Sequence, residues 1–433
     1  MERRVRARKI QPFEIPEDIL ESIFKRLPLI VIVRAKAVCS SWKSTAQTLL
    51  SSNSDLSHFK IPWLLLPPKK SKSGGAIASP RIMNLEENRV YVLNSSTQSS
   101  TLGRYLHIGS SHGWLIMADG RSIVYLLNPF TLATIQLPQL NRSLLTEPDD
   151  YLRRKDYWDT TYIPPQLLMV KAILTGEPNL SGNNNYSVIL IYSKKGLYKR
   201  IAYLKNKQGP WTELDGNKYA SYSDIMCHGN KLFGLTISAS IDIWDFQGPQ
   251  PEKRILEIKP SHYIQSNIDT RNQIRNLTRN PSGNKRITNT IRRKHYLVEL
   301  HGEILLARRF VVLRQGDHQI PHKTQLFQVY KLNFDEQKWV NVESLGDYSL
   351  FLGGNESATI STKNSSTCKA NSVYFTDDGW FRRIYGNDSN ETIGGRDMGI
   401  YNIEDGSIEE IYEIGRETIN IDPSPCWLVP HLS

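Results

Sequence analysis

The first fifty residues carry apolar side chains at helical spacing. Beginning at Ile15, apolar residues occupy positions i, i+4, i+5, i+8, i+9 and i+12, which fall on one helical face: Ile15, Ile19, Leu20, Ile23, Phe24 and Leu27. Pro16 suits a first turn, where its missing N–H has no partner anyway. Glu17 and Asp18 place negative charge at the positive end of the helix dipole. The pattern predicts an amphipathic helix that Pro28 ends.

Two further short helices are predicted before Leu50. The second covers the apolar segment Leu29 to Val38, and the third begins at the capping pair Ser40 and Ser41. A unit of this size cannot bury all of its apolar side chains internally. The surplus indicates a surface that a partner protein covers as well as a small core, and it comprises Ile15, Leu27, Val38 and Trp42.

This helical segment resembles an F-box. The resemblance rests on the leading hydrophobic-Pro pair in Ile15–Leu20, the Leu-Pro pair in Arg26–Pro28, and the closing Val-Cys-x-x-Trp in Val33–Lys43. It implies docking onto a Skp-type adaptor, which links the chain to cullin, a RING protein and a ubiquitin-conjugating enzyme. Carried onto this sequence, the implied adaptor contacts are Ile15, Pro16, Leu20, Leu27, Pro28, Val38, Cys39 and Trp42.

The pattern of the chain changes to short strands after a connecting region. The Lys, Ser and Gly residues of Lys69 to Pro80 are typical of a surface loop. From Arg104 onward, apolar or alternating runs of about four to eight residues recur between turn signals. Examples are Trp114–Ala118, Tyr186–Tyr192 and Glu303–Leu313. The expected domains are an F-box unit at 12–52, a linker with the first strands at 53–103, and a β domain at 104–433.

The strand-rich part favours a β-propeller. Turns ahead of apolar strands recur at His112-Gly113, His228-Gly229 and His301-Gly302. Units of this kind, unable to bury both faces alone, stack radially, and the strands suggest about four to seven blades of roughly four strands each. The fold class expected is mainly β with a small α N-terminal domain, a three-helix F-box followed by a propeller-like domain. A pair of packed β-sheets is the alternative.

A second resemblance supports the propeller. The segments Leu345–Gly353, Asn371–Asp378 and Pro425–Pro430, together with the turn Asn128–Thr131, are similar to the F-box-associated propeller domain of plant proteins, a domain of unknown function. These motifs have the character of structural turns and contacts between blades. They say nothing about ligands.

Charge and cysteine content limit the kinds of partner and the compartments that we expect. The net charge of +11 raises nucleic acid as an alternative partner. Part of the excess lies in Arg271–Lys294, where eight basic residues meet no acidic one, and we expect that stretch to be a solvated, flexible segment. The four cysteines do not have the spacing of a zinc site, and their wide separation is consistent with a reducing compartment. No apolar run is long enough to cross a bilayer, so we expect no membrane partner. The sequence therefore predicts a soluble protein of the cytoplasm, the nucleus or both.

No catalytic constellation emerges from the sequence. There is no glycine-rich phosphate loop, GxSxG or HExxH motif. Cys227 and His228 are adjacent on a strand and point to opposite faces, while Asp377 and Asp378 are typical turn formers. We expect no catalytic residue, cofactor or metal.

The function predicted is substrate recognition in a Skp-cullin-F-box ubiquitin ligase. The chain would bind the adaptor through its F-box and an unknown protein substrate through its propeller, with Tyr151–Tyr162 and Arg271–Lys294 as candidate substrate contacts. The alternative function is a binding protein outside any ligase, associated with nucleic acid through its basic surface.

Overall fold

A computed structural model describes most of the chain and divides it into two compact units. The described residues are 15–27, 29–51, 61–66, 81–92, 106–145, 169–178, 186–194, 198–205, 207, 209–216, 221–248, 250–256, 258, 288–315, 322–363, 365, 367–378, 397–411 and 425–430. One unit comprises Met1–Phe59 with Leu432–Ser433, and the other comprises Lys60–His431. The predicted loop Tyr151–Tyr162 lies outside the described residues.

The smaller unit holds the three predicted helices. These are α1 (Glu17–Phe24), α2 (Leu29–Ala35) and α3 (Ser40–Ser51). Pro16 is the residue that precedes α1, and its carbonyl accepts the Leu20 N–H at 3.0 Å. The three helices share a small core made of Leu20, Phe24, Ile32, Ala35, Ala46 and Leu49. The prediction of three short helices in this segment is confirmed.

The larger unit is a β-propeller of six sheets, which we number as blades along the chain. Blade 1 contains β25 (Cys426–Leu428), β1 (Trp63–Leu66), β2 (Arg81–Asn84) and β3 (Arg89–Val92). Blade 2 contains β4 (Leu106–Ser111), β5 (Trp114–Ala118), β6 (Val124–Leu127) and β7 (Thr134–Gln136), and α5 (Arg142–Leu145) follows it. Blade 3 contains β8 (Met169–Leu174), β9 (Ser187–Lys194), β10 (Tyr198–Lys205) and β11 (Thr212–Glu213).

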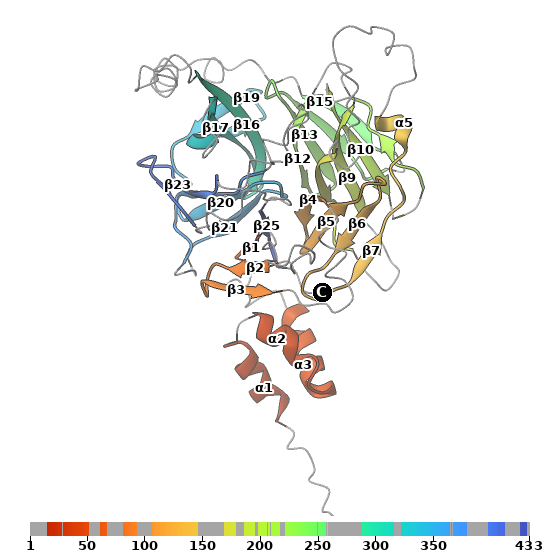
Figure 1. Ribbon diagram of the computed structural model, residues 1–433, viewed down its shortest axis with the longest axis vertical. Coiled ribbons are helices and arrows are strands. Elements are labelled where there is room, and N and C mark those ends of the chain that lie inside the picture. Colours follow the sequence, from red (N-terminus) through yellow and green to blue (C-terminus); the bar gives the residue numbers. More distant parts are fainter. Residues whose placement is uncertain are drawn as a thin grey trace, which may run out of the picture. The chain divides into compact units, whose positions relative to one another are not determined.

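The remaining three blades complete the ring. Blade 4 contains β12 (Tyr222–His228), β13 (Lys231–Thr236), β14 (Ile241–Asp245) and β15 (Glu252–Leu256). Blade 5 contains β16 (Thr288–Leu300), β17 (Glu303–Gln315), β18 (His322–Asn333) and β19 (Lys338–Val342). Blade 6 contains β20 (Tyr348–Leu352), β21 (Ala358–Ser361), β22 (Ser372–Phe375), β23 (Gly399–Asn402) and β24 (Ile408–Glu409). In Figure 1, β4, β12 and β25 lie near the middle of this unit, and β7 and β23 lie at its edge.

Apolar contacts join each blade to the next. Each core between neighbouring blades contains side chains from both blades: Ile116 and Leu190 belong to one such core, Ile191 and Trp244 to a second, Phe233 and Leu306 to a third, and Phe327 and Phe375 to a fourth. Blade 6 meets blade 1 where the rings of Phe351 and Trp427 pack edge to face with centroids 5.1 Å apart. Blade 1 meets blade 2 through Trp63 and Phe130, at 5.4 Å. Six sheets joined in this way form a closed ring, which leaves neither end of the series uncovered.

The first and last strands of the propeller close the ring in one sheet. β25, from the end of the chain, pairs antiparallel with β1, with Leu64 opposite Trp427. The unit therefore begins at Lys60, so β1, β2 and β3 belong to the propeller. On the sequence alone, residues 53–103 are assigned to a linker together with the first strands.

Two of the three His-Gly pairs, His112-Gly113 and His301-Gly302, form the turns between the first two strands of blades 2 and 5. His112 and Gly113 have φ values of 49° and 77°, and His301 and Gly302 have 53° and 78°. Two positive φ angles in a two-residue hairpin loop are typical of the type I′ turn, which explains the glycine at its second position. In blade 4, His228 is the last residue of β12 and the turn is Gly229-Asn230, so the interpretation of the pairs as turns is confirmed in blades 2 and 5 and shifted by one residue in blade 4.

One expectation about the basic stretch is wrong in part. We predicted that Arg271–Lys294 is a solvated, flexible segment, but residues 288–294 form the first half of β16, paired with β17. Lys294 also forms an ion pair with Asp378, an acid more than eighty residues away in sequence. Composition alone missed this pairing because the partner strand and the partner acid are distant in the chain.

Candidate functional site

The helical unit exposes aliphatic side chains on its surface. Ile19 and Ile23 lie one turn apart on α1 and are 50% and 40% exposed. Val31 on α2 is 38% exposed, and Val38, beyond the end of α2, is 62% exposed. Isolated surface aliphatics are ordinary, but four within one three-helix unit mark a candidate interaction surface. We call these four side chains the aliphatic surface.

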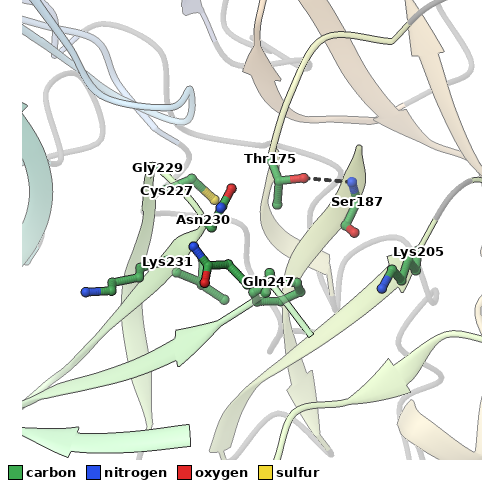
Figure 2. Close-up of a pocket in the computed structure, with 10 residues that line it drawn as sticks. Thr175, Ser187, Lys205, Cys227, Gly229, Asn230, Lys231 and Gln247 are labelled. Carbon is green, nitrogen blue, oxygen red and sulfur yellow. Dashed lines mark hydrogen bonds between the residues drawn. The ribbon is translucent and has the colours of Figure 1, made fainter. Parts of the chain in front are cut away.

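A cleft opens between blades 3 and 4 of the propeller (Figure 2). It encloses about 400 Å³, within the usual range for ligand pockets. Blade 3 and the residue after β8 contribute one side, and the β12–β13 turn with the residues after β14 contributes the other. The lining residues are Thr175, Ser187, Lys205, Cys227, Gly229, Asn230, Lys231, Leu232, Phe246 and Gln247.

Hydrogen bonds hold the two sides of the cleft together. The Tyr203 hydroxyl on β10 bonds to the Gln250 side-chain oxygen at 3.0 Å, and Lys205 Nζ donates to the Gly248 carbonyl at 3.3 Å. Within blade 3, the Ser187 N–H donates to Thr175 Oγ1 at 2.7 Å. The cleft is therefore built into the junction between the two blades.

Cys227 is the cysteine in the lining, and its environment keeps its thiol protonated. Burial, reinforced by the nearby Glu356 carboxylate, raises the pKa of the Cys227 thiol well above its usual value. A thiol must ionise to act as a nucleophile or to bind a metal. The environment of Cys227 therefore disfavours both of these roles for its thiol.

A chain of polar contacts links the inner strands of several blades. Lys171 on β8 and Asp224 on β12 form an ion pair at 2.5 Å, and Asp224 also accepts the Leu297 N–H of β16 at 2.8 Å. Ser111 at the end of β4 donates to the Glu356 carboxylate of blade 6 at 2.5 Å. Burial raises the pKa of Glu356 to about 7, so this group titrates near neutral pH.

A second buried cluster ties blade 5 to blade 6 around Arg309. Its guanidinium donates to the Asp397 carboxylate at 2.9 Å, to the Thr376 carbonyl at 2.8 Å and to Thr324 Oγ1 at 2.7 Å. The neighbouring Asp378 bonds to Lys294 and Tyr296. Burial disfavours the charged form of Asp378, but the Lys294 and Arg309 cations outweigh it and lower its pKa. Buried and held by several hydrogen bonds and ion pairs between the two blades, the cluster has the character of a structural clamp.

Among the residues described, no three His, Cys, Asp or Glu side chains are grouped so as to hold a metal ion. Within the same residues, no helix has the length and apolarity needed to cross a bilayer.

Comparison with known families decides the identity of both units. The profile of the KIB1-4 beta-propeller family matches residues 82–402, about three quarters of the chain, and the profile of the F-box domain matches residues 13–51. This chain is an F-box protein of the KIB1-4 β-propeller family. Both resemblances drawn from the sequence, to the F-box and to the propeller of plant F-box proteins, are thereby confirmed.

Relatives of this F-box protein cover most of its length. F-box only protein 7 of Arabidopsis thaliana is 25% identical over 353 residues, covering 78% of this chain and 77% of its own. F-box protein At2g05970 of the same plant is 23% identical over 371 residues and covers 84% of each chain. F-box protein KIB3, also from Arabidopsis thaliana, is 25% identical over 235 residues, or 53% of this chain and 47% of its own.

Solved structures resemble the chain only distantly. The crystal structure of the N-terminal domain of Nup159 has a TM-score of 0.33 and 9% sequence identity, and the match covers 84% of this chain and 83% of that chain. A likeness at this level bears on neither the details of the fold nor the function.

Three of the predicted adaptor contacts are exposed in the F-box. Pro16 precedes α1, and Val38 and Cys39 lie between α2 and α3. Their side chains are accessible to a partner. Pro28 lies outside the described residues.

The other predicted contacts lie in or against the helical core. Leu20 is fully buried, so we assign it to the core and not to an accessible surface. Ile15, Leu27 and Trp42 are partly buried and pack on that core, and the Trp42 ring meets Phe24 edge to face at 5.6 Å. These three offer an edge to a partner while they hold the helices together.

Sequence reasoning missed three members of the aliphatic surface. Ile19 and Ile23 were recognised as part of the apolar stripe of α1 but were not separated from its buried members, and Val31 was not singled out. The sequence feature that could have identified them is the width of the apolar stripe on α1. Six apolar positions in thirteen residues are more than two short neighbouring helices can cover.

Proposed function

We propose that this chain is the substrate-recognition subunit of a Skp-cullin-F-box ubiquitin ligase. The observation that carries the proposal is the F-box at residues 13–51, whose small core leaves an aliphatic surface uncovered. In this proposal the surface is covered by a Skp-type adaptor, through which cullin, a RING protein and a ubiquitin-conjugating enzyme join. We propose the cytoplasm, the nucleus or both as its location.

Burial of the aliphatic surface supplies the binding energy in this scheme. Fully burying one Val, Leu or Ile side chain contributes roughly 1.5–3 kcal/mol, so the four side chains contribute on the order of several kcal/mol even though each is already partly covered. Ile15, Leu27 and Trp42 add their exposed edges. An apolar contact of this type loses little affinity when salt screens charges.

The propeller holds the substrate in this scheme. A closed ring of six blades is a rigid support, and its turns and clefts present side chains without rearranging. The chain contributes no reacting group. It raises the local concentration of substrate lysines near the charged conjugating enzyme, so that a bimolecular transfer becomes effectively intramolecular.

The test is co-purification of the full chain with a purified Skp-type adaptor, comparing two matched substitutions. Ile19→Asp places a carboxylate in the aliphatic surface, and Ile237→Asp places one at an isoleucine of the propeller that is 64% exposed. We expect Ile19→Asp to abolish binding and Ile237→Asp to bind as the unsubstituted chain does. Circular dichroism checks that both variants keep their helices.

The proposal fails if the unsubstituted chain does not bind the adaptor. It also fails if Ile19→Asp, with its helices intact, binds as tightly as Ile237→Asp does.

A further inference from the structure

Two exposed apolar side chains of the propeller lie on either side of Ser221. Tyr198, the first residue of β10 in blade 3, is 46% exposed, and Ile237, which follows β13 in blade 4, is 64% exposed. Lys199, next in sequence to Tyr198, donates its N–H to Ser221 Oγ at 3.2 Å. On the other side, the Ile237 N–H donates to the Ser221 carbonyl at 2.9 Å. The two hydrogen bonds fix the backbone at both side chains, so blades 3 and 4 together hold an exposed apolar pair.

Three basic residues of blade 5 lie close to this apolar pair. They are Arg292, Arg293 and Lys294 on β16, and Lys294 is near enough to Lys199 for its charge to act on that ammonium group. Burial lowers the pKa of Lys199, and repulsion from Lys294 lowers it further. Arg292 and Arg293 are exposed. The apolar pair therefore has a basic border.

The two acids that act on Lys199 are already paired with other cations. The side chain of Asp378 is buried and forms an ion pair with Lys294. The side chain of Asp224 is buried and forms an ion pair with Lys171 at 2.5 Å. Because each carboxylate has its own cation, the potential at the basic border stays positive.

Arg292 and Arg293 keep their donors for a partner. Neither guanidinium forms an ion pair or a hydrogen bond within the part of the chain that the structure describes. Arg293 lies over the Phe310 ring, 5.8 Å from its centroid. This contact uses the face of the guanidinium and leaves the N–H groups at its edge.

We propose that this surface, made of Tyr198, Lys199, Ile237, Arg292 and Arg293, binds an acidic peptide segment of the substrate protein. An apolar side chain of the segment contacts the apolar pair, and its carboxylates pair with the two arginines, whose planar fork matches a carboxylate. Tyr and Arg are also the residues that most often dominate the energetics of protein interfaces. The inference rests on the proposed function in one respect, because it assigns the segment to the substrate.

Nucleic acid is the competing partner for a basic surface. Its binding relies on many phosphate contacts and on aromatic rings that stack on bases. Ile237, the most exposed member of the surface's apolar pair, has neither a donor for a phosphate nor a ring for a base. An aliphatic side chain among cations favours a protein segment that is both acidic and apolar.

The test measures the binding of fluorescent peptides to the full chain by anisotropy. Three libraries of equal length have randomised Asp and Glu flanks around a central Leu, the same acidic flanks around a central Gly, or Lys and Arg flanks around a central Leu. We expect the acidic library with Leu to bind at least about tenfold more tightly than the other two. Single-stranded DNA of the same net charge should bind at least about tenfold more weakly than that library.

One pair of double variants locates the apolar contact. Tyr198→Ala with Ile237→Ala should weaken binding of the acidic Leu library by about tenfold or more, because apolar burial is lost. The control, Phe334→Ala with Val340→Ala, removes side chains of blade 5 that are 46% and 37% exposed. It should leave the affinity within about twofold.

A second pair locates the charged contact. Arg292→Ala with Arg293→Ala should weaken the same binding by about tenfold or more, because charged hydrogen bonds are lost. The control, Lys331→Ala with Lys338→Ala, removes the same charge from exposed ion pairs of blade 5 and should leave the affinity within about twofold. Thermal melts check that all four variants keep their fold.

Four outcomes overturn the inference: equal binding of the acidic and basic libraries, equal binding of the Leu and Gly libraries, an unchanged affinity in either surface variant, or DNA binding as tight as that of the acidic library. Adaptor binding is measured on the same proteins. If the adaptor binds and the acidic library does not, this surface falls and the ligase proposal stands. If the acidic library binds through the surface and the adaptor does not bind, the ligase proposal falls and the surface stands.

Discussion

The F-box leaves a larger share of its apolar side chains exposed than the propeller does. The F-box buries six side chains in its core and leaves Ile19, Ile23, Val31 and Val38 exposed. The propeller buries even its largest rings, among them Trp244, Trp339 and Trp427. The contrast follows from size and closure: a unit of some forty residues has too little interior, whereas six sheets in a ring cover one another. The smaller unit is therefore the one that needs a partner.

The same contrast extends to charge. In the F-box the pair Lys25 and Glu21 is exposed to solvent. In the propeller, Arg309 with Asp397 and Lys171 with Asp224 are buried pairs held by further hydrogen bonds. A large, closed fold has enough apolar burial to offset the cost of taking charges out of water.

The largest expected effect is on the propeller, through Arg309→Met. Removing the guanidinium leaves the buried Asp397 carboxylate without its cation, although Thr324 still donates to it, and leaves the Thr376 carbonyl without the Arg309 donor. The free energy of unfolding should fall by about 3–5 kcal/mol. Denaturant titration followed by tryptophan fluorescence measures it. As a control, Lys331→Met breaks an exposed pair with Glu303 and should cost less than about 1 kcal/mol. Equal losses in both variants would contradict the structural role given to Arg309.

A second pair of substitutions sharpens the division of the F-box into core and surface. Leu20→Ala opens a cavity in the core and should lower the stability of the F-box by about 2–5 kcal/mol. Val38→Ala should change its stability by less than about 0.5 kcal/mol and weaken adaptor binding by about 1 kcal/mol or more. Thermal melts followed by circular dichroism and adaptor titrations by calorimetry separate the two effects. If Val38→Ala lowered the stability of the F-box as much as Leu20→Ala does, Val38 would belong to the core and not to the aliphatic surface.

The smallest expected effect concerns Glu356, whose pKa burial raises to about 7 from an ordinary 4.5. Between those two values the folded chain holds a proton that the unfolded chain releases, so this group lowers stability as the pH rises through the window and no further above it. Glu356→Gln keeps an acceptor for Ser111 and removes the charge. It should stabilise the propeller by about 1–2 kcal/mol at pH 8, with the gain shrinking toward pH 4.5.

Paired denaturant titrations of wild type and Glu356→Gln across this pH range provide the check. Comparing the two proteins at each pH cancels the other titrating groups, including His295, whose pKa burial lowers to about 3. A difference that stays constant with pH would show that Glu356 does not titrate as described.

The sequence predicted those helices and strands whose hydrophobic pattern is contained within the element itself. The helical period gave the three F-box helices, and the apolar run Trp114–Ala118 matches β5. The strand Tyr222–His228 was missed because Asp224 interrupts its pattern, and the cation that pairs with this carboxylate, Lys171, lies 53 residues earlier. β25 has three residues, and the strand it pairs with, β1, lies at the opposite end of the propeller's sequence. Long-range pairing of this kind leaves no mark on neighbouring residues.

The candidate sites also differ in whether their residues are close together in the sequence. The proposed adaptor contacts come from a contiguous motif, so the sequence alone is enough to propose them. The cleft between blades 3 and 4 joins Thr175 after β8 to Gln247 after β14, and the cluster at Arg309 joins β17 to Asp397. Neither follows from spacing along the chain, because the ring brings their members together.

Hydrogen exchange of the full chain with and without a purified Skp-type adaptor tests the central claim most directly. The account predicts that the adaptor slows amide exchange in peptides covering 15–51, where the F-box exposes its aliphatic surface, and leaves peptides of the six blades unchanged. Protection of propeller peptides with none in the F-box would contradict it, as would unchanged exchange throughout at saturating adaptor.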